Sequence, residues 1–172
     1  MENAATFGIG LLTWTLIEYA IHAWLSHTFK TFATPMHDGH HRDPHAVFAV
    51  GAWIPIALIW LLGLMLFGWV PGMFFYSGLV AGFAVYEAVH YRLHFVAPSG
   101  NFEAYLRSRH LVHHNRTPRA SFGVTSALWD HVFGTEVSGP AMVENIRRVA
   151  NLPPLRGPSN LGKLFRYRLF RR

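Results

Sequence analysis

The chain contains long apolar blocks separated by short polar segments. The longest block runs from Pro44 to Tyr86, where 43 consecutive residues include no Lys, Arg, Asp or Glu, and the turn-forming sequence Gly68 to Gly72 interrupts it. A bilayer core takes about 20 helical residues. The block therefore predicts a transmembrane hairpin, with one helix over roughly 47 to 69 and the other over roughly 72 to 95.

A shorter apolar block precedes the hairpin. It runs from Phe7 to Leu25, contains one charged residue, Glu18, and is long enough for a further span. The N-terminal residues lack the basic region of a signal peptide, so we expect this segment to be retained. The pattern predicts an all-α fold, an integral membrane helical bundle of about three transmembrane helices, in a single domain over residues 1–172.

The basic residues predict how this bundle is oriented. All 15 Lys and Arg lie between Lys30 and Arg172, and the predicted spans place them on one side of the membrane. Cytoplasmic loops are enriched in Lys and Arg, so we expect the C-terminus in the cytoplasm and the N-terminus outside. This asymmetry accounts for the net charge of +6 without nucleic-acid binding. Residues 161–172 alternate Leu and Phe with Lys and Arg, which predicts a basic amphipathic tail on the membrane surface, with a solvated tail as the alternative.

Ten of the twelve histidines form four clusters beside the ends of the apolar blocks. The clusters are His22 and His27; His37, His40 and His41; His90 and His94; and His110, His113 and His114. The predicted spans bring all four to one membrane face, as a cytoplasmic histidine-rich helical cap. We predict a site for two metal ions, because one ion takes about four to six ligands. The chain has no cysteine, and neutral imidazoles alone suit iron, zinc and copper alike.

Two carboxylates precede these clusters by about one helical turn. Glu87 lies three residues before His90, and Glu18 lies four residues before His22. We expect each carboxylate to accept the second N–H of a metal-bound ring and fix its orientation. The alternative is an interfacial glutamate that reaches water.

The two histidines outside the clusters are His45 and His131. We expect them to be ordinary polar residues, with His45 close enough to Asp43 to interact with it.

The clusters carry a resemblance to the histidine boxes of the fatty acid hydroxylase and sterol desaturase superfamily. The matching residues, in order, are Glu18-Tyr19 with His22 and His27; His37, His40 and His41 before Arg42-Asp43-Pro44; His90-Tyr91-Arg92-Leu93-His94; and His110, His113 and His114. The segments Phe122 to Ser126 and Trp129 to Thr135 resemble the region after the last box in fatty acid 2-hydroxylases.

The resemblance implies a membrane-bound non-haem di-iron oxygenase that uses O2 and external electrons to hydroxylate a lipid or fatty acyl substrate. The ten clustered histidines carry over as iron ligands, and zinc is a possible substitute in purified protein. The resemblance also implies that Asp130 supports a ligand from outside the coordination sphere. A helix cap or a loop hydrogen bond is the alternative for Asp130.

Two departures from the superfamily bear on partners. The chain carries no fused cytochrome b5 domain, and the first transmembrane hairpin is reduced to one span. We expect an external electron donor, a ferredoxin or cytochrome b5 system with its reductase, and a lipid substrate drawn from the membrane. The sequence leaves the oligomeric state open.

Other functions fit parts of the pattern. A sterol desaturase or carotenoid hydroxylase uses similar boxes, and substrate choice depends on tunnel shape. From another class, a bis-His cytochrome or a non-catalytic membrane metal-binding protein would also use histidines. Bis-His haem ligation explains no H-x-x-H-H cluster, and the absorption spectrum would separate a cytochrome from an oxygenase.

Overall fold

The computed structural model describes residues 2–48, 51, 53–137 and 153–157, and its secondary structure over these residues is entirely helical. The elements in chain order are α1 (Glu2–Tyr19), the π-helix η1 (Ala20–Thr28), α2 (Ala33–Arg42), α3 (Trp53–Phe67), α4 (Trp69–Phe95), α5 (Asn101–Asn115) and α6 (Leu128–Phe133). The predicted all-α class is confirmed. The predicted tail at 161–172 lies outside the described residues.

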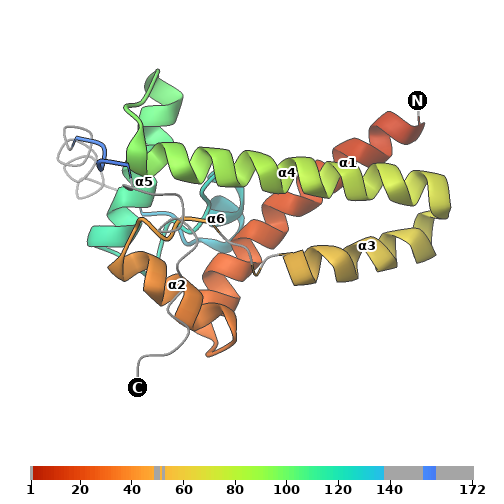
Figure 1. The fold of residues 1–172 in the computed structure, drawn as a ribbon, viewed down its shortest axis with the longest axis horizontal. Helices are drawn as coiled ribbons and strands as arrows, with labels where there is room; N and C mark the ends of the chain where they lie inside the picture. The colour runs from red at the N-terminus through yellow and green to blue at the C-terminus, as the bar shows by residue number, and fades with distance from the viewer. Residues whose placement is uncertain (1, 49–50, 52, 138–152, 158–172) are drawn as a thin grey trace.

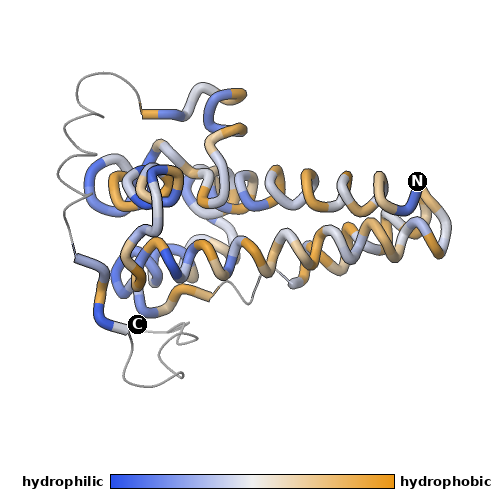
Figure 2. Tube along the Cα trace, turned by 90° about the horizontal axis from the view of Figure 1, so that it is seen from above, coloured by the Kyte–Doolittle hydropathy of each residue, from blue (hydrophilic) through white to orange (hydrophobic). Residues whose placement is uncertain are grey.

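The molecule has a long apolar end and a polar end. Figure 1 shows α1, α3 and α4 extending together away from α2, α5 and α6, which gather at the opposite end. The N-terminus and the turn between α3 and α4 lie at the far tip of the extension. Figure 2 shows hydrophobic colour along the extension and more hydrophilic colour at the gathered end. The predicted arrangement of apolar helices and a histidine-rich helical cap is therefore present.

The hairpin is shorter than the apolar block predicts. The turn between α3 and α4 is Gly68 alone, at a φ of 79°, because glycine adopts this left-handed conformation without a Cβ clash. The predicted turn over 68 to 72 is wrong, since Pro71 lies in the first turn of α4, where its missing N–H costs no helical bond. Pro55 likewise lies in the first turn of α3, which begins at Trp53 rather than near 47.

Two segments are long and apolar enough to cross a membrane. They are Glu2–Thr28, made of α1 and η1, and Trp69–Phe95, each with 27 residues. With 15 residues, α3 extends only about 22 Å, less than the roughly 30 Å of a bilayer core. Its outward side chains remain apolar, and Met65 is 84% exposed. The predicted bundle of about three apolar helices thus consists of two helices of spanning length and the shorter apolar helix α3.

Small residues allow α1 and α4 to pack with their backbones almost touching. A Cβ added at Gly78 would lie 2.2 Å from the Phe7 carbonyl oxygen and 3.1 Å from the Gly10 Cα. One further turn toward the cap, the Trp14 side chain packs against Gly82. This close approach is typical of helices that associate within a bilayer. The core around the crossing contains Trp14, Ile17, Ile56, Phe75, Leu79 and Phe83.

Candidate metal centre

The ten clustered histidines converge on two neighbouring points in the cap. The first histidine group is His22, His27, His37, His41 and His113, and the second histidine group is His40, His90, His94, His110 and His114. Within each group, one ring nitrogen from every histidine lies within 4.8 Å of the others. Residues up to 91 positions apart in sequence therefore meet at the first point.

The π-helix η1 places its two histidines in the first group. Its wider turns are marked by hydrogen bonds between residues five apart, from the Ser26 hydroxyl to the Ile21 carbonyl at 2.8 Å and from Thr28 to Ala23 at 2.7 Å. His22 and His27 are also five apart, so this geometry turns both rings the same way. An α-helix would rotate the second ring about 140° away from the first.

The two H-x-x-H-H clusters each divide between the groups. In α2, His37 and His41 belong to the first group and His40 to the second; in α5, His113 belongs to the first group and the i, i+4 pair to the second. The expectation of two metal positions has a geometric counterpart in this division. Residues i and i+4 lie about 40° apart around a helix, whereas i+3 and i+4 lie about 100° apart. Each cluster therefore reaches two adjacent points.

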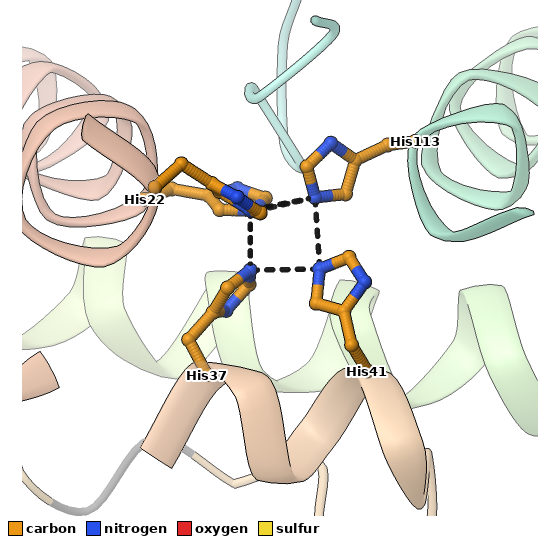
Figure 3. A group of neighbouring side chains, drawn as sticks. His22, His37, His41 and His113 are labelled. Atoms are coloured by element: carbon orange, nitrogen blue, oxygen red, sulfur yellow. Dashed lines mark hydrogen bonds between the residues drawn. The ribbon is translucent and has the colours of Figure 1, made fainter. Parts of the chain in front are cut away.

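The nitrogens of the first group are spaced as ligands of one ion would be. The Nε2 to Nε2 distances are 2.8 Å for His27–His37 and for His37–His41, 3.0 Å for His22–His113 and for His41–His113, and 3.1 Å for His27–His113. Two nitrogens bound at right angles, each about 2.1 Å from a metal, lie about 3.0 Å apart. Figure 3 shows four of these rings pointing toward one another. This donor set fits a metal ion.

The second group has the same spacing. The Nε2 distances are 2.8 Å between His94 and His110, 3.0 Å between His40 and His90, and 3.2 Å between His40 and His94. The buried Nε2 of His114 has no hydrogen-bond partner among the described residues, as expected of a nitrogen whose lone pair is reserved for a metal. The two groups adjoin, because the rings of His41 and His114 stack at a centroid distance of 4.2 Å.

Burial keeps the cap histidines in the form that binds metals. Burial, followed by the proximity of other imidazoles, lowers the pKa of His37 and His110 well below the ordinary value. The same causes lower the pKa of His41 to about 4 and that of His113 to about 3. These rings are therefore neutral at pH 7, and metal binding does not require them to lose a proton.

Backbone carbonyls orient two rings of the first group. Nδ1 of His22 donates to the Phe122 carbonyl, and Nδ1 of His113 donates to the Ala120 carbonyl at 3.0 Å. In each ring the donated proton leaves the Nε2 lone pair facing the centre of the group.

Glu18 makes hydrogen bonds to other partners than expected. Its Oε1 accepts from the backbone N–H groups of Val124 at 2.6 Å and Thr125 at 2.9 Å, and its Oε2 accepts from the Thr125 hydroxyl at 2.6 Å. The expected bond to the ring of His22 is wrong, because that ring donates to Phe122. Glu18 instead contacts the segment that carries the accepting carbonyl.

Asp130 makes hydrogen bonds to a loop, and its support of a metal ligand from outside the coordination sphere stays a prediction. It is fully buried and accepts from the backbone N–H groups of Phe122 and Gly123, both at 2.8 Å, and from Arg109 at 2.7 Å. Glu87 is half-buried on α4, one turn before His90, and its support of that ring stays a prediction.

The two histidines outside the clusters lie where they were expected. Nδ1 of His45 is 2.9 Å from Asp43. The His131 side chain is 66% exposed and pairs with Glu136 at 2.6 Å. Neither belongs to a histidine group.

A cavity of about 80 Å³ borders both histidine groups. His22 and His37 line it from the first group, and His40 and His90 line it from the second. Its other walls include the apolar side chains of Trp14, Ile21, Met36, Val47 and Tyr86. An apolar chain placed in this cavity would thus have carbon atoms beside both groups.

Comparison with known proteins gives a consistent picture. Residues 7–135 match the family described as fatty acid hydroxylase. The chain is 35% identical over 144 residues to the fatty acid 2-hydroxylase of Rattus norvegicus, with 75% of this chain and 38% of the relative covered. It is 35% identical over 137 residues to dihydroceramide fatty acyl 2-hydroxylase FAH2 of Arabidopsis thaliana, with 73% and 58% covered.

A solved structure is also similar. The structure described as full length scs7p, with only the hydroxylase domain visible, superposes with a TM-score of 0.71 at 28% identity, covering 90% of this chain and 59% of that one. The chain spans 38% to 58% of the length of the two curated relatives described above.

Proposed function

The chain belongs to the fatty acid hydroxylase family, and from this we propose that it is a membrane-bound non-haem di-iron oxygenase. Its substrate is a fatty acyl chain or a lipid that carries one. The names of its relatives, fatty acid 2-hydroxylase and dihydroceramide fatty acyl 2-hydroxylase, favour hydroxylation at carbon 2. In this proposal the ten histidines of the two groups are the iron ligands, and zinc competes for the same imidazoles during overproduction.

The observation that carries the proposal is one cavity bordered by both histidine groups. A bis-His haem would need one ring from each of two facing positions, whereas here five nitrogens surround each point. The apolar walls, including Trp14 and Met36, suit methylene groups and not a hydrated ion in transit.

The reaction balances with an external reductant. One C–H bond, O2, two electrons and two protons yield one C–OH bond and one water molecule. Bound iron would supply the activation of O2. The protein's own residues hold ten neutral imidazoles in place, position one substrate carbon at the cavity and exclude water from it. A smaller number of fixed imidazoles would leave one of the two metal positions incomplete.

The two electrons come from a separate donor in this proposal, a ferredoxin or a cytochrome b5 system. Exposed Arg42, Arg116 and Arg119 support docking of an acidic electron carrier, because they lie on or just after the helices α2 and α5 that carry histidines of both groups. Complementary charge of this kind speeds encounter between redox partners.

We expect the cap to face the cytoplasm and the tip between α3 and α4 to face the other side. The support is charge: no Lys or Arg lies between Arg42 and Arg92, the stretch that contains the tip. Single cysteines at Trp69, which is 67% exposed, and at Asn115, also exposed, test this in a chain with no native cysteine. An impermeant maleimide should label only N115C from the cytoplasmic side and only W69C from the other. Labelling of both from one side would contradict the orientation.

The activity is tested with purified iron-loaded protein in lipid nanodiscs, a reduced ferredoxin or cytochrome b5 system and 18O2. We expect an acyl lipid to gain one hydroxyl group that contains one 18O atom, and no product without O2 or donor. Mass spectrometry measures the product. A lipid that loses two hydrogens would identify a desaturase, and an unchanged lipid pool with two irons bound would contradict oxygenase activity.

A further inference from the structure

A short loop carries both carbonyl groups that orient the first histidine group. We define residues 120–125 as the bracing loop. The Ala120 carbonyl accepts from Nδ1 of His113, and the Phe122 carbonyl accepts from Nδ1 of His22. These rings come from α5 and η1, so the bracing loop joins the two sides of the first group. Displacing the loop would release both rings together.

One side of the bracing loop is held by Glu18. Its two carboxylate oxygens accept three hydrogen bonds of 2.6 to 2.9 Å from Val124 and Thr125. Glu18 is only 4% exposed. Glu18 lies on α1, one turn before His22. The same helical segment therefore holds the loop with one residue and offers a ring to it with the other.

The other side of the bracing loop is held by Asp130. Both of its oxygens accept from groups that can only donate. The Phe122 backbone N–H donates to Oδ1, and the Gly123 backbone N–H and the Arg109 guanidinium both donate to Oδ2. The Asp130 and Arg109 side chains are 0% exposed. A Cβ at Gly123 would lie 2.9 Å from Oδ2 and 2.0 Å from the Ser126 carbonyl. The backbone of the loop thus packs directly against the Asp130 carboxylate.

The second histidine group makes no hydrogen bond to the bracing loop among the described residues. Its printed side-chain bonds run between its own rings, from His40 to His90 and His94 and from His94 to His110. The buried Nδ1 atoms of His40 and His90 have no hydrogen-bond partner in the described part of the chain. The ring contacts of the bracing loop are therefore made with the first histidine group.

We propose that Glu18 and Asp130 are positioning residues that hold the bracing loop and thereby control metal occupancy of the first histidine group without controlling that of the second. This inference rests on the proposed two-metal centre. The two carboxylates act by accepting hydrogen bonds from the loop and not by binding metal. Losing such support typically weakens metal binding by about 10 to 100-fold, so one of two metals should be lost selectively.

The test uses purified iron-loaded protein dialysed against a chelator whose strength leaves both metals in the wild type, with metal content measured by elemental analysis. Glu18→Ala should retain one metal per chain. Glu18→Gln should retain two, because its carbonyl oxygen can accept both backbone N–H groups and its amide can donate to the Thr125 hydroxyl. A residue that binds metal directly would lose metal in both variants, which would overturn the proposal.

The matched control is Glu103→Ala. Glu103 accepts four hydrogen bonds, from Arg92 and Ser99, and none of them involves the bracing loop. This variant should retain two metals. Loss of a metal from it as well would show that any missing carboxylate loosens the cap, and would overturn a specific role for Glu18.

Double variants identify which metal is lost. Glu18→Ala combined with His22→Ala should still retain one metal, whereas Glu18→Ala combined with His94→Ala should retain almost none. The reverse pattern would overturn the assignment to the first group.

Asp130→Asn should behave like Glu18→Ala. In either orientation of the Asn side chain, its NH2 group would face an N–H donor and one hydrogen bond would be lost. If loss of the buried Asp130 charge beside Arg109 prevents that variant from folding, Glu18→Ala decides, since it leaves the ion pair between Arg109 and Asp130 intact.

These outcomes separate two failures. Fewer than two metals in the wild type at saturation would overturn the two-metal centre itself. Two metals in both the wild type and Glu18→Ala, with equal resistance to the chelator, would overturn only the role of the bracing loop.

Discussion

Replacing either His94 or His113 with Ala should abolish formation of the hydroxylated lipid. His94 belongs to the second histidine group and His113 to the first, so each variant removes a nitrogen from a different metal position. The remaining rings cannot fill the gap, because His94 and His113 lie on helices that hold their Nε2 atoms 2.8 to 3.2 Å from neighbouring nitrogens. Product is measured by mass spectrometry under equal protein, O2 and donor.

The control for this experiment is His131→Ala. That ring is 66% exposed and pairs with Glu136 outside both groups, so most activity should remain. Wild-type activity in His113→Ala together with loss of activity in His131→Ala would refute the site. Full activity in only one of the two ligand variants would show that a single metal position suffices.

Hydropathy predicted the helices of the extension well, because a long uncharged segment has few alternatives to a helix in an apolar environment. It did not predict where they begin. Pro71 was expected in the turn and Pro55 inside a helix from about 47, yet both lie in first helical turns, where proline is tolerated. Hydropathy measures composition, whereas the boundary between α3 and α4 depends on a single left-handed glycine at 68.

Sequence spacing predicted which histidines come together but not how they are shared between the two histidine groups. The i, i+3, i+4 spacing of His37, His40 and His41 and of His110, His113 and His114 places each set on one side of its helix, and the structure divides each set between two points. The five-residue spacing of His22 and His27 was the available signal for η1, since only a π-helical turn aligns residues i and i+5. Such a turn is too rare to predict from spacing alone.

The supports of the first histidine group were beyond sequence reasoning. Glu18 was expected to serve the ring four residues later, but its partner Val124 is 106 residues away. Arg109, fully buried between Asp130 and Glu136, was not singled out at all. The one signal was the resemblance over Phe122 to Thr135, which marked the right segment and implied a supporting role for Asp130 without specifying its contacts. Local spacing predicts neighbours on one helix, whereas these carboxylates join separate elements.

Gly78→Val should prevent the protein from folding into a monodisperse species. At Gly78 the first added carbon already lies 2.2 Å from the Phe7 carbonyl oxygen and 3.1 Å from the Leu11 backbone nitrogen. Both contacts are backbone atoms, so no side chain can rotate away, and α1 and α4 must separate. Overpacking of an interior costs about 1–3 kcal/mol, and occasionally more, and separation would also displace Trp14 from Gly82. Size-exclusion chromatography in detergent measures the folded fraction.

Gly8→Val is the matched control, because a Cβ at Gly8 meets nothing within 4 Å. Valine has a higher helix propensity than glycine by a few tenths of a kcal/mol, so this variant should fold as well as the wild type and keep its metals. Gly78→Ala should lie between the two, with a lowered thermal midpoint. Equal yields of folded protein for Gly78→Val and Gly8→Val would contradict the close crossing. Because η1 continues directly from α1 and four histidines lie on η1 and α4, a separated crossing would also dismantle both histidine groups.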